Sequence, residues 1–442
     1  MKKYLSIKFL SAFLIVSLIS CETDFDNPNS ASESVVLSTR EGVLAVAVGL
    51  KQIYSTSGLR FVIETPAITT REAATTTTFI NMIELEDGGS ALPNFNSNVI
   101  GLWSNMLRVV KISETILSSI ESIALEPGTR SGLSAYANLY KALAIGNLSQ
   151  NFEQVIIATN DNNSSDFVSR QEGFQEATRL LNEAILEIEQ QPVSGEFTTE
   201  IINNEIDLQN TLYAMLARYS LFAGNYNEAI AAADRVDLTK ISLFNYDALN
   251  INPIYARVIL GGAPNFKPRD NFGLPAELVE PGDGRLEFYT EPLDAVNPNG
   301  LPIEDLAGFF DNSNESIPLY IPDEMKLIKA EAYLRMATPN PTAALALINE
   351  VRTDTSDPLG VNAGLPAYSG SEAIADLLLE VYKNRRAELF LTGMSLEDSR
   401  RFGRPQPSLE SRVYTDERNR NFYPYPDIER NNNPNTPADP AI

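Results

Sequence analysis

Four loop segments of this chain place an aromatic ring beside planar polar side chains. They are Asn94-Phe95-Asn96, Asn265-Phe266, Arg269 to Phe272, and Arg285 with Tyr289. A pyranose has apolar C–H faces that can stack on such rings, and a rim of hydroxyl groups that pair with Asn, Asp and Arg. The pattern therefore gives eight candidate ligand contacts: Phe95, Asn96, Phe266, Arg269, Asp270, Phe272, Arg285 and Tyr289.

The same rings have a simpler explanation, because aromatic side chains in loops also anchor those loops to a core. For any single ring we favour this second interpretation. Trp103 is the one tryptophan, and it shares a helical face with Leu102, Met106 and Val110. That spacing predicts a core residue and not a binding platform.

Cys21 is the only cysteine of the 442 residues. Three lysines precede an apolar stretch from Phe9 to Ile19, which is shorter than the ~20 residues that a membrane-spanning helix needs. Residues 1–20 are thus predicted to be a cleaved export signal. The segment Leu18 to Cys21 is similar to a lipobox, so we expect acylation of Cys21. An ordinary secretory signal with an incidental cysteine is the alternative.

The composition excludes several kinds of chemistry. The chain has no histidine, which rules out histidine triads, histidine-ligated zinc and histidine general bases. A net charge of −24 repels nucleic acid and anionic lipid headgroups, so we expect no nucleic-acid partner. Glycoside hydrolysis needs two carboxylates at a defined separation, and among 58 acidic residues the sequence nominates no pair. No catalytic residue and no cofactor is predicted.

One short acidic segment, Asp161 to Asp166, offers oxygen ligands suited to calcium. It lacks the glycine and the bidentate glutamate of the usual calcium loop, so it is interpreted as a polar turn. The sequence therefore predicts no metal site.

Residues 22–34 are acidic, small and turn-prone, which is typical of a flexible linker. We assign residues 21–40 to a lipidated tether and residues 41–442 to a single domain. Within that domain, helix-period apolar stripes predict about four helix pairs of the tetratricopeptide type, which form a frame. The expected pairs are Val43–Tyr54 with Leu102–Ser118, Ser134–Leu148 with Phe174–Glu189, both helices within Leu221–Val236, and both within Leu327–Val351.

Three segments lack such stripes and are predicted to be rich in loops, at about 64–98, 237–319 and 405–442. Long irregular segments in a compact domain are usually functional or disordered, and the aromatic residues of 237–319 argue against disorder. The sequence thus predicts a helical frame that presents a loop-rich half, where the ligand would bind.

Eight arginines fall between residues 385 and 420. They could pair with carboxylates elsewhere in the fold or dock onto a partner protein. Pairing at the surface is the favoured expectation.

Several C-terminal blocks carry a family resemblance. Tyr320 to Met336 reads YIPDEMKLIKAEAYLRM, and Ala344 onward reads ALALINEVRTDT. Lys383 to Arg404 reads KNRRAELFLTGMSLEDSRRFGR, and Phe422 to Asn435 reads FYPYPDIERNNNPN. In spacing and residue type these blocks resemble the SusD/RagB family of nutrient-uptake lipoproteins.

The resemblance implies a mostly α, SusD-like fold and a lipoprotein on the outer face of the outer membrane. Such a protein would bind an oligosaccharide and deliver it, without catalysis, to a SusC-like TonB-dependent β-barrel transporter. Three alternatives stay open: capture of peptides in the same kind of transporter complex, a helical-repeat scaffold that binds only proteins, and a hydrolase.

Overall fold

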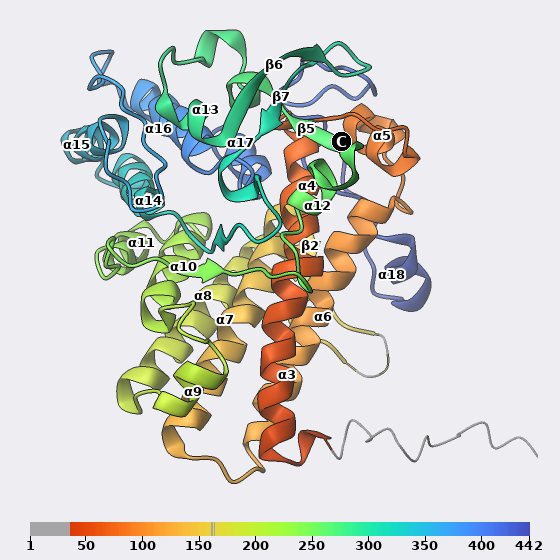
Figure 1. Cartoon of the computed structure of the whole chain (residues 1–442), viewed down its shortest axis with the longest axis vertical. Helices are drawn as coiled ribbons and strands as arrows, with labels where there is room; N and C mark the ends of the chain where they lie inside the picture. Colours follow the sequence, from red (N-terminus) through yellow and green to blue (C-terminus); the bar gives the residue numbers. More distant parts are fainter. Residues whose placement is uncertain (1–35, 161, 163) are drawn as a thin grey trace, which may run out of the picture.

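The computed structural model describes residues 36–160, 162 and 164–442. Helices make up the lower part of the molecule in Figure 1, and shorter elements joined by loops make up the upper part. Cys21, the export signal and most of the predicted tether lie outside the described residues. Asp161 and Asn163 of the predicted polar turn also lie outside them.

The fold is mostly α, as predicted, and all four expected helix pairs pack against each other: α3 with α6, α7 with α8, α10 with α11, and α14 with α15. The frame helices are α3 (Arg40–Ile53), α4 (Leu59–Thr69), α6 (Ser97–Ile120), α7 (Pro127–Asn151), α8 (Arg170–Gln190), α9 (Gly195–Glu200), α10 (Leu208–Phe222), α11 (Tyr226–Ala233), α14 (Pro322–Arg335) and α15 (Pro341–Arg352). A π-helical turn, η1 (Tyr54–Gly58), joins α3 to α4.

Local signals explain where these helices begin and end. At the start of α8, Ser169 and Glu172 form a reciprocal capping box, which satisfies two backbone N–H groups. The predicted stripe of this helix, which includes Phe174, Leu181 and Ile185, is buried. Pro192 follows the last turn and prevents its continuation.

The loop-rich half contains the remaining helices: α5 (Ile80–Asp87), α12 (Tyr255–Val258), α13 (Gly284–Tyr289), α16 (Ile374–Glu388), α17 (Ser395–Arg401) and α18 (Asp427–Asn432). It also contains 3₁₀ turns: η2 (Gly89–Ala91), η3 (Leu260–Gly262), η4 (Asp270–Gly273), η5 (Ala276–Leu278) and η6 (Gly308–Phe310). The first predicted loop segment began too early, because α4 continues to Thr69, and α5 lies inside that segment.

The strands are short and form antiparallel pairs. They are β1 (Ala73–Thr75) with β5 (Phe266–Pro268), β2 (Gln154–Val155) with β3 (Val168–Ser169), β4 (Leu243–Phe244) with β8 (Ile317–Pro318), and β6 (Thr290–Val296) with β7 (Pro302–Leu306). In the first pair Thr75 lies opposite Phe266. This register ties the loop after α4 to the segment after α12, although about 190 residues separate them in sequence.

Trp103 is a core residue, as predicted. Its ring packs edge-on against Phe152 at 4.7 Å between centroids, and its indole nitrogen donates to Glu429 at 3.0 Å. A buried indole N–H needs an acceptor, and here α18 supplies it. The C-terminal segment is thereby fixed to the frame.

The arginine-rich segment forms ion pairs, but the expectation that they lie at the surface was wrong for most of them. Arg385 is buried against Asp398, and Arg401, whose side chain is 11% exposed, pairs with the buried Glu331. Among the eight arginines, the side chain of Arg412 is the most exposed of those that form ion pairs. Apart from Arg412, these arginines therefore lie in or at the edge of the interior of the loop-rich half.

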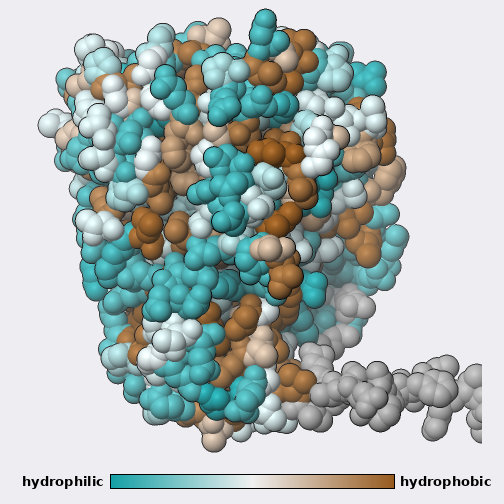
Figure 2. Space-filling model, in the orientation of Figure 1, coloured by the Kyte–Doolittle hydropathy of each residue, from teal (hydrophilic) through white to brown (hydrophobic). Residues whose placement is uncertain are grey.

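The described part of the chain contains no helix that could span a lipid bilayer. Hydrophilic and hydrophobic residues are interspersed over the face in Figure 2. Hydrophobic residues gather toward its upper right, where Figure 1 places α5 and α12.

Candidate ligand-binding surface

Five of the eight predicted ligand contacts are buried: Phe266, Phe272, Tyr289, Arg285 and Asn96. Phe266 lies in β5, and the ring of Phe272 packs edge-on against Phe390 at 5.4 Å. Tyr289 packs on the same Phe390 ring and donates its hydroxyl to the carbonyl of Glu388 at 2.9 Å. Side chains in these positions anchor the loops to the core, which is the simpler explanation given above, and offer no face for a ligand to stack on.

Arg285, the fourth buried residue, belongs to a network of charges at the start of α13. Its guanidinium donates to both carboxylate oxygens of Asp283, at 2.8 and 2.6 Å, and to Glu388 at 3.2 Å. With every side of the guanidinium paired in this way, Arg285 fixes the position of α13 on α16.

Arg269 and Asp270 lie together, on a different part of the loop-rich half. The guanidinium of Arg269 contacts Asp270 at 3.2 Å, and both residues line an open pocket with Arg71 and Tyr414. Neither is buried, so both are available to a ligand, and their role stays a prediction.

Phe95 and Asn96 lie at the start of α6. The Phe95 ring is 62% exposed, whereas Asn96 is buried. The Asn96 carboxamide oxygen caps α6 by accepting from the backbone of Asn98, and its nitrogen donates to the Asn81 carbonyl at 2.8 Å. Asn96 therefore fixes the backbone that presents the Phe95 ring to solvent.

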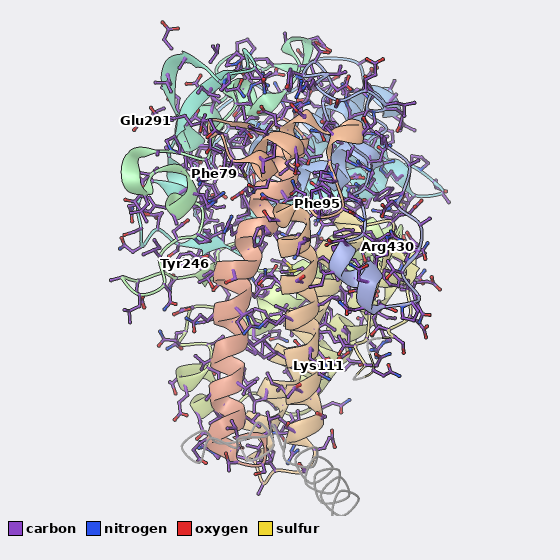
Figure 3. The ribbon with its side chains drawn as sticks, turned by 90° about the vertical axis from the view of Figure 1, so that its right-hand side faces the viewer. Phe79, Phe95, Lys111, Tyr246, Glu291 and Arg430 are labelled. Carbon is purple, nitrogen blue, oxygen red and sulfur yellow. The ribbon has the colours of Figure 1, made fainter. Side chains whose placement is uncertain are left out.

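A second exposed ring, Phe79, is the N-cap residue of α5 and is 56% exposed, whereas Phe95 comes one residue before the N-cap of α6. Figure 3 shows Phe79 and Phe95 in the upper half of one face of the molecule. The two helix starts are tied together, because Asn81 of α5 donates to Asn98 of α6 at 2.5 Å. The two rings are thus presented from a single hydrogen-bonded unit.

Planar polar side chains continue from this unit into α4 and α12. Asn98 donates to Glu64 at 2.8 Å, and Arg257 donates to the same carboxylate at 2.9 and 3.2 Å. Arg60 approaches Glu64 at 3.4 Å, and its guanidinium lies 4.5 Å over the Phe61 ring. Burial lowers the pKa of Arg60, while Glu64 opposes the shift.

We call the exposed rings of Phe79 and Phe95, together with the half-buried side chains of Asn81 and Arg257, the α5–α6 surface. Its rings suit the C–H faces of a sugar, and its amide and guanidinium groups suit hydroxyl groups. Glu64 and Asn98 are fully buried beneath it, and their hydrogen bonds fix Arg257 and Asn81 in place.

Sequence reasoning identified Phe95, and Asn96 that fixes it, but missed the other members of this surface. Phe79 and Asn81 lie in the irregular segment 64–98 that the sequence singled out, but a lone phenylalanine after threonines gives no sign of exposure. Arg257 joins Glu64 across 193 residues of sequence, and no local pattern predicts such a contact.

Comparison with solved structures identifies the fold of the chain. No protein-family model matches the chain, and no curated protein sequence matches it. Solved structures do match. A SusD superfamily protein from Bacteroides thetaiotaomicron superimposes with a TM-score of 0.67 at 15% identity, covering 91% of this chain and 100% of its own.

Two further structures are described as SusD-like carbohydrate binding proteins. The one from Bacteroides fragilis has a TM-score of 0.68 at 14% identity, and covers 90% of this chain and 99% of its own. The one from Bacteroides vulgatus has a TM-score of 0.64 at 16% identity, and covers 83% and 84%. These matches confirm the SusD-like fold that the C-terminal sequence blocks implied.

Proposed function

We propose that this chain, which has a SusD-like fold, is a surface-exposed lipoprotein that binds an oligosaccharide without catalysis. It would then deliver the oligosaccharide to a SusC-like TonB-dependent transporter in the outer membrane. The observation that carries the proposal is the α5–α6 surface, where two exposed rings are accompanied by the half-buried side chains of Asn81 and Arg257. Structures of the same fold that are described as carbohydrate binding proteins support the choice of ligand.

Binding is tested by calorimetric titration of the purified protein with a panel of neutral oligosaccharides and a panel of peptides. We expect at least one oligosaccharide to bind and to be recovered intact. Stacking on one ring contributes about 0.5–1.5 kcal/mol, so Phe79→Ala and Phe95→Ala should each weaken binding by roughly 2- to 10-fold.

Leu249→Ala is the matched control, because Leu249 is a large apolar side chain that is 91% exposed and lies outside the α5–α6 surface. Its affinity should equal that of the unmodified protein. Binding of peptides with no response to any sugar would replace the glycan proposal with peptide capture. Cleavage of the bound oligosaccharide would refute the non-catalytic role.

The membrane attachment rests on Cys21 and is tested separately. Cells that express the chain should incorporate labelled fatty acid into it and retain it in the outer-membrane fraction. Cys21→Ala should abolish labelling and release the protein. Retention of the label in the variant would contradict acylation at this cysteine.

A further inference from the structure

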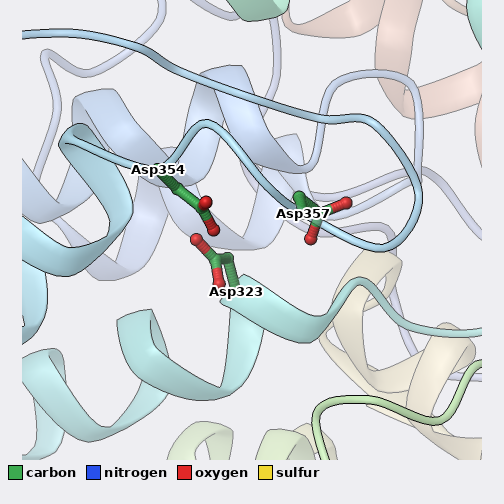
Figure 4. Close-up of side chains that lie close together, drawn as sticks. All are labelled: Asp323, Asp354 and Asp357. Carbon is green, nitrogen blue, oxygen red and sulfur yellow. The ribbon is translucent and has the colours of Figure 1, made fainter.

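Three aspartates from two parts of the chain converge in the loop-rich half, although the sequence predicts no metal site. Asp323 lies in the first turn of α14, and Asp354 and Asp357 lie in the loop that follows α15. Figure 4 shows the carboxylates of Asp323 and Asp354 facing each other, with the carboxylate of Asp357 to one side of them. One oxygen from each lies within 4.8 Å of the others.

In each aspartate, one carboxylate oxygen already has a partner within the protein. Oδ1 of Asp323 is 2.6 Å from the ammonium of Lys326. Oδ1 of Asp357 accepts from the backbone N–H of Leu359 at 2.7 Å, and Oδ1 of Asp354 accepts from the backbone N–H of Ser356 at 2.8 Å. These bonds fix the orientation of all three carboxylates.

The second oxygens are different. Oδ2 of Asp323 and Oδ2 of Asp357 have no hydrogen-bond partner, although the two residues are only 2% and 7% exposed. A buried carboxylate oxygen without a partner costs free energy, so its presence in a native fold calls for a ligand. Oδ2 of Asp354 has only a long contact of 3.8 Å to Lys326.

The charges nearby do not balance. Lys326 is the cation that contacts Asp323 and Asp354, so one ammonium faces three carboxylates. Burial, with help from Asp354 and Asp357, raises the pKa of Asp323 to about 6 against the opposing effect of Lys326. Burial also raises the pKa of Asp357 and, well above its usual range, that of nearby Glu388.

We propose that Asp323, Asp354 and Asp357 bind a calcium ion. All three donors are hard oxygen atoms, and Ca²⁺ takes oxygen ligands at about 2.3–2.6 Å. Two oxygens on opposite sides of one such ion are therefore about 5 Å apart, which accommodates the observed spacing. Backbone carbonyls and water would complete the coordination. This site is independent of the α5–α6 surface and of the function proposed for it.

The ion would fix the loop from Asp354 to Ala363 against α14. That loop already contacts α13, because the N–H of Gly284 donates to the carbonyl of Ala363 at 2.9 Å. Calcium would thus connect a frame helix to the loop-rich half at the point where Asp283 and Arg285 begin α13.

The test uses the full mature protein, stripped with a chelator and titrated with CaCl₂ by calorimetry at neutral pH. We expect one site with submillimolar affinity that accounts for a rise in the thermal midpoint, and weaker binding of MgCl₂, which requires shorter bonds and a stricter geometry. Asp357→Asn should weaken calcium binding at least tenfold and remove the calcium-dependent rise. Asp376→Asn, at an exposed position on α16, should change neither.

Two further variants keep the proposal falsifiable if Asp357→Asn does not fold. Asp354→Asn alters the least buried of the three and should show the same loss of calcium binding. Lys326→Met removes the competing ammonium and should tighten calcium binding. The absence of binding and of any thermal shift in about 5 mM calcium would overturn the proposal. Equal affinities in the Asp354, Asp357 and Asp376 variants would overturn it as well.

Discussion

The helical frame and the loop-rich half are held together by different interactions. In the frame, small residues let helices approach: Gly146 of α7 lies directly under the ring of Tyr219 on α10. In the loop-rich half, buried arginines hold separate segments together by hydrogen bonds. Arg386 donates to the carbonyls of Phe272 and Thr70, and Arg420 donates to the carbonyl of Gly89.

The difference follows from how each half satisfies its backbone. A helix pairs its own N–H and C=O groups, so its side chains are free to form an apolar interface. A loop leaves carbonyls unpaired, and a buried guanidinium with five N–H donors can satisfy several at once. Several of the buried guanidinium groups also pair with a carboxylate, as Arg385 does with Asp398, which explains the ion pairs beneath the loops.

The largest effect is expected from removing one of these carboxylates. Asp398 of α17 accepts from Arg385 at 2.9 and 3.1 Å and from Arg401 at 2.8 Å, and all three residues are largely buried. Asp398→Ala leaves Arg385 without a carboxylate and should lower the free energy of unfolding by about 3–5 kcal/mol, measured by urea denaturation.

The control for Asp398→Ala is Glu183→Ala in the frame. Glu183 pairs with Arg179 at the surface of α8, where both side chains are about half exposed. An exposed pair of this kind contributes about 0–1 kcal/mol. Similar losses in the two variants would show that buried charge does not hold the loop-rich half together.

A smaller effect should appear as a dependence of stability on pH. Burial raises the pKa of Glu72 to about 7, and Arg386, 3.8 Å away, only partly opposes the shift. The folded state therefore holds this proton more tightly than the unfolded state. The contribution to stability is full below about pH 4.5 and is lost as the pH rises through 7, by up to roughly 3 kcal/mol.

Glu72→Gln should remove this loss, so its unfolding free energy should fall less than that of the unmodified protein between pH 5 and pH 7. Glu397 is the counterexample within the same half. Despite its burial, Arg170, Arg400 and Arg401 lower its pKa to about 2, so its contribution is present at neutral pH and is lost only as the pH falls toward 2. An unchanged slope in Glu72→Gln would contradict the assignment to Glu72.

The difference between the two halves also explains which features could be predicted from the sequence. Helix pairs such as α10 with α11 depend on periodic apolar residues and on Gly224, whose positive φ ends the first helix, and these signals are local. Contacts between loops are not local. Nothing near Phe266 in the sequence shows that β1 will cover it, and nothing near Asp323 shows that Asp357 will face it. Most of the rings that were predicted to contact a ligand therefore lie in the core, and the sequence predicted only part of the α5–α6 surface.

The smallest of the three effects tests the frame. A Cβ at residue 146 would lie 2.2 Å from the Tyr219 ring, which is buried and cannot move away freely. Gly146→Ala should therefore cost about 1–3 kcal/mol through overpacking. Gly195→Ala is the matched control, because a Cβ at that helical position meets nothing within 4 Å and should be neutral or stabilise by up to about 1 kcal/mol.

Since no charge is involved, the loss of unfolding free energy in Gly146→Ala should be equal at pH 5 and pH 7. A loss that changed with pH would show that the frame also depends on ionisable groups, and the contrast between the two halves would fail.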